Sequence, residues 1–342
     1  MSQRSAVARL AEEKGLVIVG QEALTLRRQR CGKGFAFLTP GGNFVRDAAE
    51  IRRLKALAVP PAYVNVRFAA DPAAHLQAIG EDAAGRRQYR YHPSWAEVRE
   101  ALKARRLAGL AKSLPKIRRA VGRCLSLDHT DRRFVAASIV ELVSLTAIRA
   151  GGEEYARERG TRGATTLLKS NVRVGDNSVV TLSFKAKGGK VVTKHVRSPR
   201  FHAAVSRLLR LPGRRLFQCT EADEVRPVRA AEVNAFLKEV AGRRISLKDF
   251  RTLVASAAAL KALAATEPAA GERQRRRQVR EAVIEIAEEL ANTPTVCRTS
   301  YVHEAVIAAF EAGALKNPRI RKAKSAVTQA EVLARIVTRH GG

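Results

Sequence analysis

Residues 178–196 read SVVTLSFKAKGGKVVTKHV, and this stretch decides the fold class because it interrupts a half of the chain that otherwise carries helical patterns. Apolar and polar residues alternate on both sides of the Lys-Gly-Gly at 187–189, as they do in two strands joined by a tight turn. Farther on, residues 279–290 place apolar side chains at helical spacing. We therefore predict a mostly α-helical domain that carries one β-hairpin.

The first hundred residues have a different character. Short runs that favour strands, GLVIVG, ALTLRRQR and GFAFLT, are separated by glycine-rich turns. One helix is expected over residues 47–57, and it ends before Pro60 because the residue preceding a proline avoids the α region. The sequence thus predicts an α+β, bilobed protein: a small, mainly β N-terminal domain over residues 1–100, a larger, mostly α domain over residues 101–315, and a basic C-terminal tail over residues 316–342.

The composition favours a soluble, intracellular protein with a phosphate-rich partner. Of 342 residues, 63 are Lys or Arg and 32 are Asp or Glu, a formal net charge of +31, while 46% are hydrophobic. That hydrophobic content excludes a disordered basic tail, and the charge excess favours a polyanion such as a nucleic acid. We expect no membrane span, because no apolar run reaches the roughly 18 residues that one needs, and no signal peptide. The cysteines and histidines are scattered, so we expect reduced thiols, no metal site and no cofactor.

Arg149 falls on the apolar stripe predicted for the helix over residues 135–145, where an apolar residue would normally face the core. A buried guanidinium needs an anion, because desolvating it alone is costly. The anion is either a carboxylate of the same chain, such as Glu153 or Glu154, or a ligand. Taken alone, the position of Arg149 favours the salt bridge.

Arg251 lies near the start of another predicted helix, which the capping-box pattern of Ser246 and Asp249 opens. In the first turn of a helix the macrodipole disfavours a cation unless an anion is bound there, and helix N-termini are natural phosphate sites. The alternative is a solvated arginine beside a cap that Asp249 already satisfies.

Two further residues could carry chemistry. Lys187 at the tip of the hairpin is either a solvated turn residue or an ammonium that the hairpin delivers to DNA. Thr293 and Pro294 have the pattern of an N-cap followed by proline at the first helical position, which places Tyr301 two turns inside a new helix and within reach of Asn292. A lone tyrosine on an amphipathic helix is more often a core residue.

In chain order, four segments resemble the motifs of the type IB DNA topoisomerases, specifically the poxvirus-like enzymes of bacteria: TAIRAGGEEYARERG (146–160), FKAKGGK (184–190), LKDFRT (247–252) and NTPTVCRTSY (292–301). GRRQYRYHPSW (85–95) and LPKIRRAV (114–121) are similar to the N-terminal domain and to the start of the catalytic domain of that family. The resemblance covers nearly the whole chain.

The resemblance implies a mechanism. Tyr301 would attack a DNA phosphodiester and leave a 3′-phosphotyrosyl link, so that positive and negative supercoils relax by strand rotation and religation without ATP or metal. Arg149 and Arg251 would hold the nonbridging oxygens of the transition state, Lys187 would protonate the departing 5′-oxygen, and Asn292 would donate a hydrogen bond to a nonbridging oxygen. Many members have His where this chain has Asn292, and an amide donates a hydrogen bond but transfers no proton.

DNA contacts outside the chemistry follow from the same resemblance. It implies that Gln88, Tyr89, Tyr91 and Tyr155 contact double-stranded DNA and that a monomer encircles the duplex as a clamp in the bacterial cytoplasm, at the nucleoid, without a membrane or an obligatory protein partner. Residues 88–91 alternate like a strand, so one of Tyr89 and Tyr91 is expected to face the small core instead.

Two other functions compete with a topoisomerase. Tyrosine recombinases share the transesterification and the fold, but they usually place the second arginine in a His-x-x-Arg motif, and here that stretch reads Lys248-Asp-Phe-Arg251. A basic nucleoid-binding protein without chemistry would need none of the four motifs.

Overall fold

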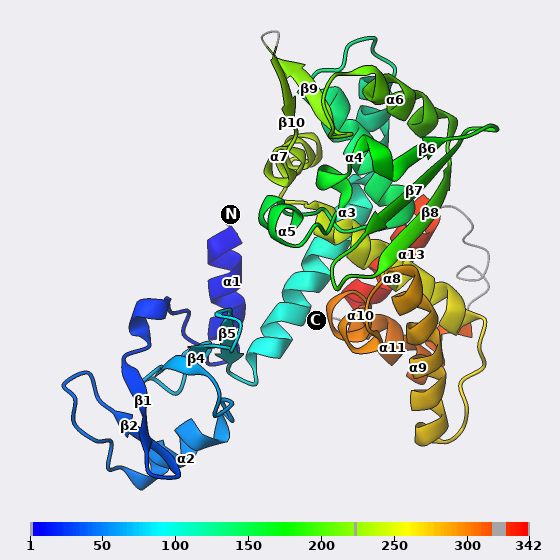
Figure 1. Ribbon diagram of the computed structural model, residues 1–342. Coiled ribbons are helices and arrows are strands. Elements are labelled where there is room, and N and C mark those ends of the chain that lie inside the picture. The colour runs from blue at the N-terminus through cyan, green and yellow to red at the C-terminus, as the bar shows by residue number, and fades with distance from the viewer. Residues whose placement is uncertain (1–2, 222–223, 317–325, 341–342) are drawn as a thin grey trace. The chain divides into compact units, whose positions relative to one another are not determined.

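The computed structural model describes residues 3–221, 224–316 and 326–340, and it divides into two compact units, residues 1–102 and 103–342 (Figure 1). Helix α3 (Trp95–Leu125) runs from the first unit into the second. The first unit is rich in strands and the second in helices, so the predicted α+β class is confirmed. No helix among the described residues is both long and apolar enough to cross a bilayer.

The first unit is built on a five-stranded antiparallel sheet with the order β2-β1-β3-β4-β5. The strands are β1 (Leu26–Cys31), β2 (Gly34–Leu38), β3 (Val64–Phe68), β4 (Leu76–Glu81) and β5 (Arg87–Tyr91). Helices α1 (Gln3–Glu12) and α2 (Ala48–Ala56) accompany it, and the Asp47 carboxylate caps α2 by accepting from the Ala49 N–H at 2.8 Å. Phe37 and Phe68 meet edge to face in the core, with ring centroids 5.4 Å apart.

The second unit packs its helices around α4 (Arg132–Thr146), which is buried along most of its length because its sequence is apolar on every side. The other helices of this unit are α5 (Glu153–Glu158), α6 (Pro199–Arg210), α7 (Ala230–Ala241), α8 (Leu247–Ala264), α9 (Glu272–Glu289), α10 (Pro294–Ser300), α11 (Glu304–Glu311) and α13 (Ala326–His340). Two small sheets complete it: β6 (Val172–Val174), β7 (Val179–Lys185) and β8 (Val191–Arg197), and the pair β9 (Gln218–Glu221) and β10 (Glu224–Pro227).

The β7–β8 hairpin forms where the sequence predicts it. Lys185 pairs with Val191 at the end of the ladder, and Gly188 and Gly189 in the turn have φ of +88° and +82°, a region that favours glycine. The alternation along β7 buries Val180, Leu182 and Phe184 against the helical core. One face of the hairpin is therefore fixed, while its tip is exposed.

The chain end differs from the expected basic tail over residues 316–342. Residues 326–340 form α13, and the side chains of Leu333 and Val337 are buried in the main core. Most of the basic stretch 316–325 lies outside the described residues.

Candidate active site

Arg149 lies in a loop and not in a helix, so the prediction that it continues the apolar stripe of the helix is wrong. Helix α4 stops at Thr146 because Ala147 takes a left-handed conformation with φ of +51°. The Arg149 carbonyl accepts from the Ala164 N–H at 2.8 Å. Gly163 has no room for a side chain, since a Cβ there would lie 2.5 Å from that same Arg149 carbonyl oxygen. The backbone at Arg149 is thus fixed by a second segment of chain.

Arg149 contacts Asn292 and not a carboxylate. Its Nη2 donates to Asn292 Oδ1, and its Nη1 donates to the Ala291 carbonyl at 3.2 Å. The salt bridge that the sequence favoured is absent among the described residues, where Glu153 pairs with Arg215 instead. Asn292 is buried, and its Nδ2 has no hydrogen-bond partner among those residues. A buried N–H without a partner is an open position for an acceptor.

Arg251 is buried in the core of the same region. It is the fifth residue of α8, one place beyond the first turn where we expected it, and Ser246 and Asp249 form the predicted capping box. Only 3% of Arg251 is exposed, so the solvated alternative is wrong. Its Nη1 and Nη2 donate to the carbonyls of Ala147 and Leu290, the latter at 3.2 Å. Burial lowers the pKa of Arg251 from its usual value.

Tyr301 lies against Arg251. The guanidinium carbon of Arg251 is 4.7 Å from the centroid of the tyrosine ring. Thr293 and Pro294 begin α10 as predicted, but the helix ends at Ser300, so Tyr301 is its C-cap residue and not an interior one. Tyr301 as a whole is 9% exposed and belongs to the main core.

Ser256 fixes the turn that carries Tyr301. This fully buried serine of α8 donates its hydroxyl to the Tyr301 carbonyl at 3.0 Å and accepts from the His303 N–H at 3.0 Å. Helix α8 therefore holds Arg251 with one turn and the backbone around Tyr301 with the next. No sequence pattern points to Ser256, because a small polar residue in an Ala-rich helix resembles its neighbours.

Lys187 lies elsewhere in this structure. Its Nζ is 5.5 Å from the ring centroid of Tyr155, which is 42% exposed on α5. A different lysine of the hairpin, Lys194, lines a small cavity together with Arg149 and Arg251, and it donates to the Glu289 carbonyl at 2.7 Å. Lys187 is not among the residues that line this cavity.

Gln88, Tyr89 and Tyr91 lie on the edge strand β5 of the first unit. Tyr89 and Tyr91 are 40% and 41% exposed, with ring centroids 6.2 Å apart, so the expectation that one of them faces the core is wrong. The reason is the period of a strand, in which residues two apart share a face. Gln88 lies on the other face, where its amide donates to Asp82 Oδ2 at 2.9 Å.

The arrangement can bind and stabilise a phosphate that gains negative charge. Two guanidiniums, one partnerless amide N–H and a phenol come together from the α4–α5 loop, α8, the α9–α10 turn and the end of α10. Within residues 3–221, 224–316 and 326–340, both arginines donate to neutral oxygens, which leaves both positive charges for a ligand. Fixed cations in a poorly solvated site favour a transition state that carries extra charge.

Comparison with known proteins shows the family of this chain. Residues 93–330 match the family model for the eukaryotic DNA topoisomerase I catalytic core, and residues 34–82 match the one for the bacterial DNA topoisomerase IB N-terminal domain. The chain is 30% identical to DNA topoisomerase 1B of Acanthamoeba polyphaga mimivirus over 283 residues, 80% of this chain and 84% of that one.

One similar solved structure is the XerH site-specific recombinase bound to difH substrate, in a pre-cleavage complex. It matches at a TM-score of 0.34 and 15% identity, over 58% of this chain and 50% of that one. This likeness is too weak to bear on function. The family matches instead cover both units of the chain, and they are all topoisomerases. The chain is therefore an enzyme that belongs to the type IB DNA topoisomerases.

Proposed function

We propose that this protein relaxes positively and negatively supercoiled duplex DNA through a transient break in one strand. The oxygen of Tyr301 bonds to a backbone phosphorus while the bond to the 5′-oxygen breaks, and the phenol proton passes to water. The 3′-phosphotyrosyl bond keeps the energy of the phosphodiester, so the reverse reaction reseals the strand without ATP. Between the two steps the free 5′ end rotates about the intact strand.

The contact between Arg251 and Tyr301 carries this proposal. It sets the nucleophile beside a buried cation that has no carboxylate partner among the described ion pairs. In the proposal Arg251 and Arg149 hold the nonbridging oxygens, and the Nδ2 of Asn292 donates to one of them. The chemistry needs no group beyond these side chains and a proton donor for the leaving oxygen.

Lys187 is the proposed proton donor. The hairpin tip is exposed, and the ammonium rests over Tyr155, so DNA on this face would meet both side chains. The 5′-oxygen leaves with the proton of the Lys187 ammonium, which a developing alkoxide requires. We also propose that Tyr155 on α5, the exposed Tyr89 and Tyr91 of β5 and the half-buried Gln88 of the same strand contact the duplex. The monomer is the active form in this proposal, and it acts at the nucleoid.

The test uses plasmids of both supercoil signs in EDTA, with denaturant to trap any covalent adduct. The full-length protein should relax both plasmids, and Tyr301→Phe should bind DNA without forming an adduct. An adduct in Tyr301→Phe, or relaxation of one sign only, would contradict the proposal. Site-paired recombinant products would indicate a recombinase.

The role of Lys187 has its own test. Lys187→Ala should cleave an ordinary duplex slowly and a duplex with a bridging 5′-sulfur at the wild-type rate, because a thiolate leaves without a proton. Lys190→Ala, which removes another exposed lysine of the same turn, is the matched control and should cleave both substrates normally. Absence of rescue would remove Lys187 from the acid role.

A further inference from the structure

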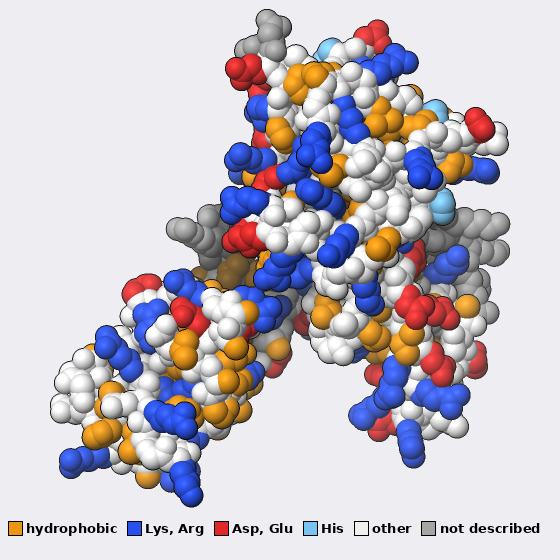
Figure 2. All heavy atoms as spheres, viewed as in Figure 1, with side chains coloured by type: hydrophobic (Ala, Val, Ile, Leu, Met, Phe, Trp, Pro, Cys, Tyr) orange, Lys and Arg blue, Asp and Glu red, His pale blue; other side chains and the backbone are white. Residues whose placement is uncertain are grey.

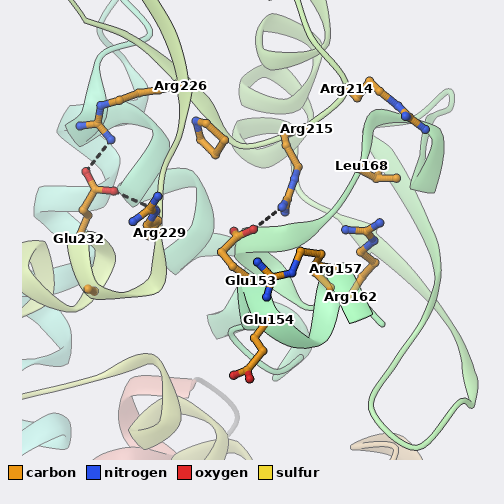
Figure 3. Close-up of a pocket in the computed structure, with 13 residues that line it drawn as sticks. Glu153, Glu154, Arg157, Arg162, Leu168, Arg214, Arg215, Arg226, Arg229 and Glu232 are labelled. Carbon is orange, nitrogen blue, oxygen red and sulfur yellow. Dashed lines mark hydrogen bonds and ion pairs between the residues drawn. The ribbon is translucent and has the colours of Figure 1, made fainter. Parts of the chain in front are cut away.

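A large arginine-lined hollow lies next to the candidate active site. It has a volume of about 1180 Å³ and opens between α5, the loop before β9, strand β10 and the start of α7 (Figure 3). Six arginines line it, and we call it the arginine basin: Arg157, Arg162, Arg214, Arg215, Arg226 and Arg229. Lys and Arg side chains are spread over the visible surface of this unit, as Figure 2 shows, but the basin gathers them into one concave site.

The carboxylates of the basin neutralise only part of this charge. Three glutamates line it, so the formal charge of its ionised side chains is six minus three, or +3. Glu153 pairs with Arg215, and Glu232 pairs with Arg226 at 2.9 Å. Figure 3 shows these two ion pairs in separate parts of the basin. Glu154, the third glutamate, forms no ion pair among the described residues, so it neutralises none of the remaining arginines by direct contact.

Several guanidinium groups are therefore left for a ligand. Arg162, Arg214 and Arg229 form no ion pair in the part of the chain that the structure describes. The Nη1 of Arg215 is buried and has no hydrogen-bond partner there. The pKa of Arg162 is lowered, first by partial burial and then by the like charge of Arg215; Glu153 opposes this shift and Arg214 adds to it. An anion in the basin would satisfy the open N–H group and relieve this repulsion.

Arg162 connects the basin to the candidate active site. It lines the basin, and it also lines the small cavity that Arg149, Lys194 and Arg251 share. A chain of phosphates with one member on Arg149 and Arg251 would therefore continue past Arg162 into the basin. The volume is larger than a single phosphate needs, which favours a polymer over a free anion.

We propose that the arginine basin binds backbone phosphates of the duplex next to the reacting phosphate, with Arg162 and Arg214 as the principal contacts. This inference rests on the proposed function, because it takes the reacting group to be a DNA phosphate. The planar guanidinium matches two phosphate oxygens at once and suits backbone positioning without reading sequence. Arg162 then sets the path of the strand between the basin and Tyr301.

The first test is the salt dependence of duplex binding, measured with full-length protein in the Tyr301→Phe background so that no cleavage interferes. Each lost phosphate contact lowers the slope of log K against log salt by about 0.9, so between 50 and 200 mM salt the variant should lose about 3.5-fold less affinity than its parent. Arg162→Ala and Arg214→Ala should both show this change. Arg119→Ala, an exposed arginine of α3 outside the basin, should not. An unchanged slope in both basin variants would overturn the proposal.

The second test locates the contact. Single methylphosphonate linkages, which are uncharged, are placed one at a time on both sides of the cleavage position. Neutralising the phosphate that Arg214 contacts should weaken the parent but not Arg214→Ala, whereas other linkages should weaken both alike. If no linkage is coupled to Arg214 or Arg162, the basin does not hold the backbone and the proposal is wrong. Failure of the proposed function would show separately, as wild-type protein that forms no covalent adduct on the same unmodified duplex.

Discussion

The change Ser256→Ala removes the two hydrogen bonds that fix the turn carrying Tyr301. Both are 3.0 Å long, and the serine is fully buried, so water cannot replace the hydroxyl. The Tyr301 carbonyl and the His303 N–H each lose this partner at a typical cost of about 1–3 kcal/mol. We therefore expect the free energy of unfolding to fall by about 2–6 kcal/mol, the sum for the two groups.

The same change should slow strand cleavage. If about 2 kcal/mol of the lost energy held the phenol in line with the phosphate, formation of the covalent adduct slows about 30-fold. The assay is single-turnover cleavage at saturating enzyme, at a temperature where circular dichroism shows the variant folded. Urea unfolding gives the stability change on the same protein.

Ser138→Ala is the matched control. Ser138 is equally buried in a helix, but its hydroxyl donates only to the Phe134 carbonyl of its own helix, at 2.9 Å. It should cost about 1 kcal/mol of stability and leave the cleavage rate unchanged. Wild-type cleavage by folded Ser256→Ala, or equal slowing by Ser138→Ala, would refute the positioning role of Ser256.

Two further predictions follow from local geometry. Gly163→Ala should slow cleavage more than Gly160→Ala in a single-turnover assay, because a Cβ at 163 would lie 2.5 Å from the Arg149 carbonyl oxygen. A Cβ at 160 adds backbone strain at φ of +64° but meets nothing within 4 Å. Equal rates would show that the Arg149 loop tolerates displacement. Burial raises the pKa of the Cys297 thiol from 9.0 to about 11, so the folded state keeps its proton longer than the unfolded state does. The stability that this thiol contributes should be complete below pH 9 and be lost as the pH rises toward 11. Urea unfolding at pH 8, 9, 10 and 11 should therefore show a smaller loss of stability in Cys297→Ala than in the wild type. Parallel plots of stability against pH for the two proteins would contradict the pKa shift.

The sequence predicts the parts of this molecule that carry local patterns. The hairpin around residues 187–189, the capping box at Ser246 and the start of α10 at Thr293 follow from turn, cap and strand chemistry alone. The β9–β10 pair was missed because its four-residue strands are mostly charged or polar and show no clear alternation. Turn and cap residues near each other in the sequence thus mark where these elements begin.

The sequence does not predict where helix α4 ends or which residues far apart in the chain contact each other. Arg149 was placed on a helix that stops before it, because nothing in the sequence marks the left-handed conformation of Ala147. The contact of Arg149 with Asn292 joins residues 143 positions apart and depends on how α9 packs. The arginine basin likewise draws on four separate segments, so its arginines look like ordinary surface charge in the sequence.

Backbone carbonyl oxygens hold the two arginines of the site by hydrogen bonds, and this affects how readily substrate and product exchange there. The carbonyls of Ala147, Leu290 and Ala291 orient the guanidiniums of Arg251 and Arg149 without cancelling their charge. A carboxylate in their place would compete with every incoming phosphate and would have to be displaced on each turnover. Dipoles impose no such exchange, so in the proposed mechanism the same resting geometry receives the intact strand, the phosphotyrosyl strand and the resealed strand in turn.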